Sequence, residues 1–172
     1  MTYTLIITEK PNASKRIAES IAEHTPKKVS VNGVPYYELT VNKKKVVVAC
    51  AVGHLYALRE KKKSKGFSYP VFEIEWAPAS EVSKATFSKK YTEVIKSLSK
   101  KADEFIIATD FDIEGEVIGF NCLRFACNQK DAKRMKFSTL TKPDIVDAFA
   151  HLQPHIAWGM ANAGEARHKL DW

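Results

Sequence analysis

Only three cysteines occur in the 172 residues, and no two of them form a Cys-x-x-Cys pair. This scarcity disfavours both a disulfide framework and a structural zinc site. Glycine and proline contribute seven residues each, too few for a low-complexity chain. The longest hydrophobic run, 46–52, is far shorter than the roughly 20 residues of a membrane span, and the N-terminus lacks a secretory leader pattern. We therefore expect a cytoplasmic globular protein that does not contact a membrane.

Acidic residues are too few to balance the basic ones, and the net charge is +7. The excess is concentrated in residues 42–65, where seven lysines and one arginine stand against a single glutamate. A local basic surface on an otherwise neutral chain predicts contact with a polyanion. We expect DNA as that partner, with Lys61, Lys62 and Lys63 among the contacts. The alternative is a lysine-rich hairpin tip and loop that are simply solvated.

Strand-like and helix-like patterns alternate along the chain. Short runs rich in β-branched residues predict buried strands at 4–8 and 104–109, and residues 36–51 resemble a hairpin. Further strands are expected at 72–76 and 136–138, with an exposed basic loop at 59–70. Helical spacing predicts helices at 11–24, 87–98, 117–126, 142–150 and 155–170. This alternation predicts an α/β fold with a mostly parallel central sheet and helices on both faces.

The segment 108–116 contains four carboxylates. Residues two apart in an extended chain point to the same side, so Asp110 and Asp112 share a side and Glu114 follows closely. Two carboxylates about 4 Å apart repel by about 4 kcal/mol at an effective dielectric constant of about 20, so a proton or a cation is favoured between them. Hard oxygen ligands suit Mg²⁺, which keeps several waters and accepts a phosphate.

Two other interpretations apply to the same acids. Asp112 could cap the following helix, with the other acids in its first turn, and this role does not exclude metal binding. The spacing also imitates an EF-hand loop. Position 12 of that loop would be Asn121 instead of glutamate, and the preceding residues resemble a strand, so we reject the EF-hand.

Glu9 and Lys10 stand where the first predicted strand ends. Ligands of open α/β sheets gather at the carboxyl ends of the strands, so Glu9 and the later acids could converge there. The alternative is an ordinary surface Glu–Lys pair. No glycine loop surrounds Lys10, which excludes a Walker-type phosphate site.

These two segments, 8–11 and 110–116, resemble the two motifs of a Toprim domain. Other segments are similar to the N-terminal part of type IA DNA topoisomerases, in the form found in archaeal topoisomerase I and topoisomerase III: 51–55, 69–70, 76–78, 137–141 and 163–172. The resemblance implies a Rossmann-like Toprim fold with a β-hairpin insertion. It assigns residues 1–150 to the Toprim domain and 151–172 to the start of a following helical domain.

The resemblance also implies a reaction. Type IA topoisomerases cut one DNA strand through a 5′-phosphotyrosine, pass a strand and reseal the break without ATP. Glu9 would be the general acid and, on resealing, the base, and Lys10 would stabilise charge on the phosphoryl oxygens. Mg²⁺ would be held by Glu9, Asp110, Asp112 and Glu114. The residues that would approach a single-stranded DNA segment are His54, Arg167 and His168; the alternatives are a structural turn at His54 and a helix cap at Arg167.

Two departures from the family pattern stand out. Ile113 occupies a position where many members carry arginine. No tyrosine of this chain stands in the Tyr-x-Arg-Thr setting of the family's nucleophile, so we expect a fragment that acts with the remaining domains of its polypeptide and does not cleave DNA alone. No obligate protein partner is inferred. The rival functions are a stand-alone Toprim metal-dependent nuclease and a non-catalytic nucleic-acid-binding module.

Overall fold

The computed structural model describes residues 2–61, 70–83 and 85–172. Its strands are β1 (Tyr3–Thr8), β2 (Lys27–Val31), β3 (Val34–Val41), β4 (Lys44–Cys50), β5 (Tyr56–Glu60), β6 (Ile74–Pro78), β7 (Ala102–Ala108) and β8 (Lys133–Arg134). Its helices are α1 (Pro11–Ile21), α2 (Ala79–Val82), α3 (Thr86–Ser99), α4 (Ile113–Asn121), α5 (Lys142–Ala150) and α6 (Trp158–Asp171), and a π-helical segment, Cys122–Ala126, continues α4.

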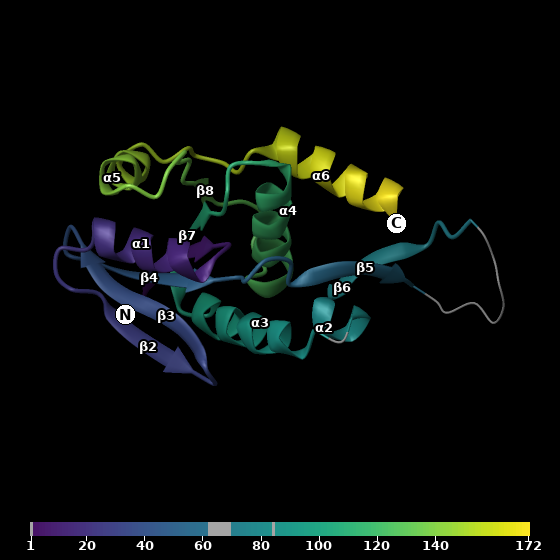
Figure 1. Cartoon of the computed structure of the whole chain (residues 1–172), viewed down its shortest axis with the longest axis horizontal. Helices are drawn as coiled ribbons and strands as arrows, with labels where there is room; N and C mark the ends of the chain where they lie inside the picture. The colour runs from purple at the N-terminus through teal and green to yellow at the C-terminus, as the bar shows by residue number, and fades with distance from the viewer. Residues whose placement is uncertain (1, 62–69, 84) are drawn as a thin grey trace.

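Six strands form one sheet in the order β2-β3-β4-β1-β7-β8. The central strand β1 is parallel to both of its neighbours, β4 and β7, and β8 is parallel to β7. The pairs β2–β3 and β3–β4 are antiparallel. The predicted mostly parallel sheet is therefore confirmed. The hairpin predicted at residues 36–51 is the antiparallel pair β3–β4, which belongs to this sheet. A second antiparallel pair, β5–β6, was not predicted as a hairpin and extends away from the sheet in Figure 1.

Hydrophobic cores lie on both faces of the sheet, because side chains alternate along the fully buried strand β1. Leu5 and Ile7 pack into the core that includes Ile95 of α3, whereas Ile6 packs with Ile17 of α1 on the other face. Figure 1 shows α1 and α5 on one side of the sheet and α3 on the other. Helices thus cover both faces, as the alternating pattern predicts.

Two sheet elements differ from the sequence prediction. Strand β2 was not predicted, because its side chains are mostly exposed at the sheet edge and carry little hydrophobic pattern. The predicted strand at 136–138 is wrong: the strand next to β7 is β8, two residues long, which lies at Lys133–Arg134. A buried arginine occupies this strand, so hydrophobicity could not locate it.

Two other elements begin elsewhere than predicted. Phe72, expected to begin a half-buried strand, is 84% exposed and precedes β6. Helix α4 begins at Ile113, four residues before the predicted start, and its predicted last turns are π-helical. The earlier start places the carboxylates of residues 114 and 116 inside the first turn of α4.

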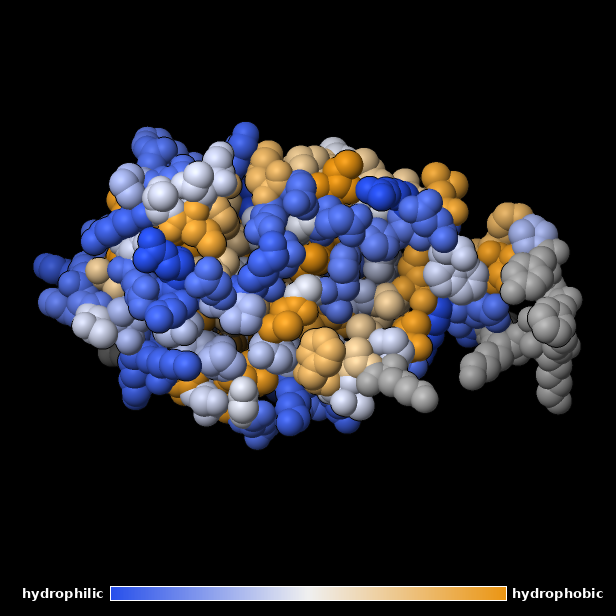
Figure 2. Space-filling model, in the orientation of Figure 1, coloured by the Kyte–Doolittle hydropathy of each residue, from blue (hydrophilic) through white to orange (hydrophobic). Residues whose placement is uncertain are grey.

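None of the helices within the described ranges is both long and apolar enough to cross a bilayer. Hydrophilic residues cover most of the face shown in Figure 2, and hydrophobic ones show through in separate places, including over α6. This face therefore presents mainly polar side chains.

Candidate functional site

The carboxyl ends of β1, β4 and β7 meet at one edge of the sheet. Thr8, the last residue of β1, is opposite Cys50 in β4 and Ala108 in β7. The backbone N–H of Ala51 donates to the Thr8 carbonyl at 2.9 Å, and that of Gly53 donates to the Glu9 carbonyl at 3.2 Å. The segments that follow these strands therefore start side by side, near the middle of the molecule (Figure 1).

Glu9 lies at this edge with only 16% of its side chain exposed. Its Oε2 atom is buried and has no hydrogen-bond partner among the described residues. Burial raises the pKa of Glu9 above its ordinary value, and the negative charge of Asp110 raises it further, although Lys10 acts in the opposite sense. Glu9 can therefore keep a proton at a higher pH than an exposed glutamate, which suits a group that donates and recovers a proton.

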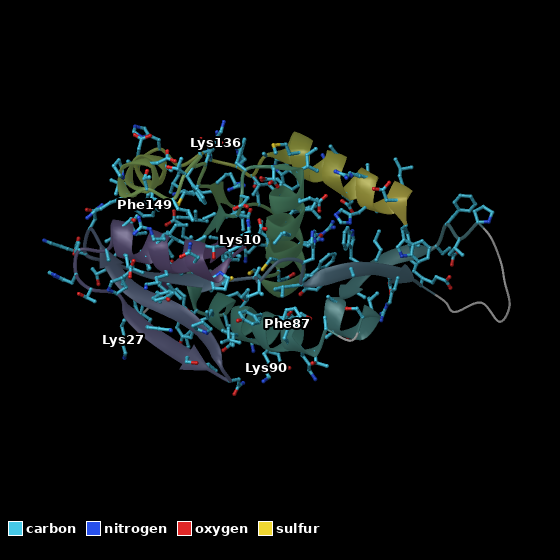
Figure 3. The ribbon with its side chains drawn as sticks, viewed as in Figure 1. Lys10, Lys27, Phe87, Lys90, Lys136 and Phe149 are labelled. Carbon is cyan, nitrogen blue, oxygen red and sulfur yellow. The ribbon has the colours of Figure 1, made fainter. Side chains whose placement is uncertain are left out.

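Lys10 joins the two predicted motifs. Its Nζ lies 2.5 Å from Asp110 Oδ2 and 3.8 Å from Glu9 Oε1. The hydrogen bond to Asp110, followed by the charge of Glu9, raises the pKa of Lys10. Lys10 precedes the first turn of α1 and lies near the centre of the view in Figure 3. The predicted convergence of Glu9 and Asp110 is thus present in the structure.

The turn between β7 and α4 is held by a cap and a glycine. Asp112 is the N-cap of α4, and its Oδ1 accepts a hydrogen bond from the Gly115 backbone N–H at 2.6 Å. A Cβ on Gly115 would lie 2.0 Å from the Asp110 carbonyl oxygen, so only glycine allows this approach. Asp112 therefore has the capping role proposed from the sequence, and its Oδ2 is free of that bond.

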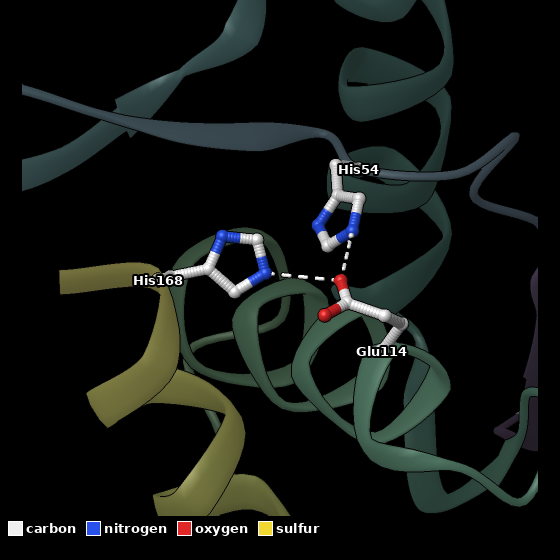
Figure 4. Close-up of side chains that lie close together, drawn as sticks. All are labelled: His54, Glu114 and His168. Carbon is white, nitrogen blue, oxygen red and sulfur yellow. Dashed lines mark hydrogen bonds and ion pairs between the residues drawn. The ribbon is translucent and has the colours of Figure 1, made fainter. Parts of the chain in front are cut away.

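Glu114 turns toward two histidines. The Nε2 atoms of His54 and His168 lie 3.1 Å and 3.0 Å from the same oxygen, Glu114 Oε2 (Figure 4). Burial, followed by the neighbouring His168, lowers the pKa of His54. Burial tends to raise the pKa of Glu114, but the hydrogen bonds and charges of His168 and His54 together outweigh it, and the pKa lies below its ordinary value. The carboxylate form of Glu114 is therefore favoured.

The predicted magnesium ligands surround the same edge without forming a closed set. Across the described ranges, the one group of three His, Cys, Asp or Glu ligand atoms that lie within 4.8 Å of one another is His54, Glu114 and His168. The predicted quartet supplies no such group of three. Glu114, a predicted magnesium ligand, thus contacts His54 and His168, which were predicted to approach DNA.

A buried ion pair between Arg134 and Glu116, which the sequence did not predict, supports this edge of the sheet. Arg134 Nε donates to Glu116 Oε2 at 2.9 Å, and both side chains are at most 1% exposed. Arg134 Nη2 also donates to the Asp110 carbonyl at 3.0 Å, and Glu116 Oε1 accepts from the Ala157 N–H at 2.8 Å. The pair therefore fixes the end of β7 and connects it to the start of α6.

The predicted basic surface is divided in the structure. Lys43 lies in the β3–β4 turn, and Lys44 and Lys45 begin β4 directly after it. At about 3.3 Å per residue, the amino end of β4 is about 20 Å from Cys50, which lies beside Glu9. Arg59, in β5, is paired with two glutamates. Among the basic residues that the structure describes, the three lysines at the amino end of β4 are therefore remote from the carboxyl edge.

The structure describes two of the four remaining residues that were predicted to contact DNA. Arg167, on α6, is 63% exposed in its side chain, and its Nε lies 3.5 Å from Asp171 Oδ2. Lys61 is exposed directly after β5. Lys62 and Lys63 lie outside the described residues.

Comparison with known proteins places these residues in a family context. A family model described as the Toprim domain matches residues 4–140. DNA topoisomerase 1 of Methanocaldococcus jannaschii is 51% identical over 168 residues, which are 98% of this chain and 22% of that protein. DNA topoisomerase 1 of Pyrococcus horikoshii is 50% identical over 171 residues, which are 98% of this chain and 25% of that protein.

A solved structure agrees with these matches. The full-length topoisomerase I from Thermotoga maritima superimposes with a TM-score of 0.64 and 26% sequence identity, over 97% of this chain and 24% of that one. The chain thus spans about a quarter of the length of the proteins it matches.

Proposed function

The chain belongs to the Toprim domain family, and on that premise we propose that it is the magnesium-binding part of a type IA DNA topoisomerase. The observation that carries the proposal is the contact of Lys10 with both Glu9 and Asp110, which unites the two Toprim motifs at one sheet edge. Half of the residues are identical to those of two proteins named DNA topoisomerase 1, which supports this parent over other Toprim proteins.

The residues present fit a magnesium ion. Glu9 Oε2 is a buried oxygen without a partner in the described ranges, and the negative charges of Asp110 and Asp112 both raise the pKa of Glu9. Such oxygen-rich, negatively charged surroundings suit Mg²⁺. Asp110 and Asp112 would hold the ion, with Glu9 and Glu114 as the further ligands. When bound, the ion supplies positive charge against the charge that develops on the phosphoryl oxygens.

Each chain residue at the edge has a role in the proposed reaction. Glu9 protonates the leaving 3′-oxygen of the DNA and removes the proton on resealing, a step in which a positioned acid contributes about 10²–10⁴-fold. Its burial and raised pKa keep that proton available. The side chain of Lys10 is 59% exposed, so its ammonium group can leave Asp110 and pair with a phosphoryl oxygen instead. The attacking tyrosine belongs, in this proposal, to the rest of the polypeptide.

DNA approaches the edge from the side of α6. His54, Arg167 and His168 would contact the backbone of a single-stranded segment, and Lys61, Lys62 and Lys63 would contact its continuation. We propose that the Toprim domain ends near residue 150 and that residues 151–172 begin the next domain. In this arrangement His168 comes from the second domain and lies at the edge of the Toprim sheet. A cytoplasmic location belongs to the same proposal.

The proposal is tested by titrating the chain with MgCl₂ while its backbone amides are followed by NMR, and by incubating it with single-stranded DNA. We expect saturable shifts at Glu9 and at 110–114, which the double variant Asp110→Asn, Asp112→Asn abolishes and the exposed control Asp147→Asn preserves. We expect no DNA cleavage. Cleavage by the chain with Mg²⁺ or Mn²⁺ would identify a nuclease instead, and unchanged shifts in the double variant would refute the magnesium site.

A further inference from the structure

Three separate elements bring His54, Glu114 and His168 together. His54 follows a turn in which Val52 and Gly53 have φ values of 53° and 77°, Glu114 lies in the first turn of α4, and His168 lies on α6. The close approach of α6 to α4 depends on Gly164, where a Cβ would lie 2.3 Å from Val117 Cγ2. The packing of the fold, and not a flexible loop, therefore sets the position of His168.

The separations are close to those around a tetrahedral ion. Two ligand atoms bound at about 2.0–2.1 Å to one tetrahedral ion are about 3.3 Å apart. The two Nε2–Oε2 distances, 3.1 Å and 3.0 Å, would need to widen by only about 0.2–0.3 Å to reach that value. One ring nitrogen of each histidine lies within 4.8 Å of the other. A three-ligand site therefore forms when side-chain rotation also brings these two nitrogens to about 3.3 Å.

The donor set selects the metal. Two imidazole nitrogens and one carboxylate form the set found at zinc sites that keep a fourth position open for water or another ligand. Magnesium prefers oxygen ligands and binds imidazole poorly. The three side chains are between 30% and 45% exposed, so an ion can enter from solvent. The three cysteines, which could compete for zinc, are all buried.

We infer that His54, Glu114 and His168 form a binding site for Zn²⁺, separate from the magnesium position at Asp110 and Asp112. The site stands on this geometry and does not require the proposed function. One consequence does rest on the proposed function: Glu114 cannot serve both ions with the same oxygen, so zinc occupancy weakens magnesium binding.

The competing explanation is a cluster held by hydrogen bonds alone, in which both imidazoles donate from Nε2 to the carboxylate. The two explanations differ in the nitrogen signals. A bound zinc ion replaces the Nε2 protons and shifts both Nε2 resonances together with one equivalent of metal. A hydrogen-bonded cluster leaves these resonances unchanged when zinc is added.

The test is a ZnCl₂ titration of the 172-residue chain, followed by calorimetry and by the imidazole ¹⁵N spectrum. We expect one equivalent to bind and to shift His54 and His168. His168→Ala and Glu114→Gln should each weaken binding by more than about tenfold, because even outer partners of zinc ligands contribute about 10–100-fold. His151→Ala, which removes a histidine 73% exposed in its side chain on another part of the chain, is the matched control and should leave the affinity unchanged.

Circular dichroism of each variant checks that it is folded, and Glu114→Gln keeps the size of the side chain if His168→Ala does not fold. Absent binding in the wild-type chain, or equal affinity in the two ligand variants and the control, would overturn the zinc site. A second titration, with MgCl₂ after zinc, tests the shared ligand. Independent binding of the two ions would refute the competition while leaving the zinc site intact, and a failed magnesium titration without zinc would count against the proposed function alone.

Discussion

Lys10 and Asp110 are 100 positions apart in the sequence, and their side chains meet with Nζ 2.5 Å from Oδ2. The contact occurs because β1 and β7 are adjacent parallel strands, so the residues that follow them emerge at the same edge. Lys10 thereby places a positive charge where the fold gathers carboxylates. The ammonium group of Lys10 neutralises carboxylate charge that a bound metal ion would otherwise neutralise.

Replacing Lys10 should therefore strengthen magnesium binding. Lys10→Gln removes the cation that competes for Asp110, and we expect the Mg²⁺ dissociation constant to fall by up to about fivefold, the scale of one exposed ion pair. Lys15→Gln removes a lysine that is paired with Glu19 on α1, and it should leave the constant unchanged. Weaker binding in Lys10→Gln would show that Lys10 organises the acids instead of competing for them.

Breaking the Arg134–Glu116 pair should strongly destabilise the fold. Arg134→Met leaves a buried carboxylate without its cation, which typically costs about 3–5 kcal/mol in free energy of unfolding. Urea denaturation measures the change. Arg167→Met removes an exposed arginine and should alter the free energy of unfolding by less than about 0.5 kcal/mol. A similar small change in Arg134→Met would show that the pair contributes little to holding the end of β7.

The sequence predicted the strands that end at the site, but it did not predict the buried Arg134 that supports them. β1 and β7 were predicted because short buried strands consist of β-branched and other apolar residues, and Asp110 and Glu9 followed from the strand ends. Arg134 gave no such signal, because its burial depends on a partner in α4 and on three backbone carbonyls. Hydrophobic patterns cannot locate a buried charge.

The contacts of His54 and His168 with Glu114 could not be predicted from the sequence, for a different reason. His54 and His168 were both identified as candidate site residues, but no local rule relates positions so distant in the chain. Their meeting at Glu114 depends on how α6 crosses α4, and that crossing depends on the absence of a side chain at Gly164. Such a contact is a property of tertiary packing, which the sequence pattern of either helix alone does not contain.

Adding a methyl group at that crossing should therefore separate the helices. In Gly164→Ala the new Cβ would lie 2.3 Å from Val117 Cγ2 and 2.9 Å from Ile113 Cγ2, so α6 or these side chains must move. We expect a loss of about 1–3 kcal/mol in free energy of unfolding and altered ¹⁵N signals of His168. Gly159→Ala, in the same helix, meets nothing within 4 Å and should be neutral or stabilising by up to about 1 kcal/mol. Equal behaviour of the two variants would show that the crossing is not tightly packed.

The divided basic surface permits a matched test of DNA binding. The triple variant Lys61→Gln, Lys62→Gln, Lys63→Gln should flatten the log–log dependence of single-stranded DNA affinity on salt by about 0.7 for each phosphate that the protein no longer neutralises. The triple variant Lys43→Gln, Lys44→Gln, Lys45→Gln removes the same charge from the β3–β4 turn and the first two residues of β4. That turn is about 20 Å from the carboxyl edge, beyond the roughly 10 Å Debye length at 0.1 M salt, so the slope should not change. A flatter slope in the second variant alone would place the DNA at the opposite edge of the sheet, away from Glu9 and Asp110.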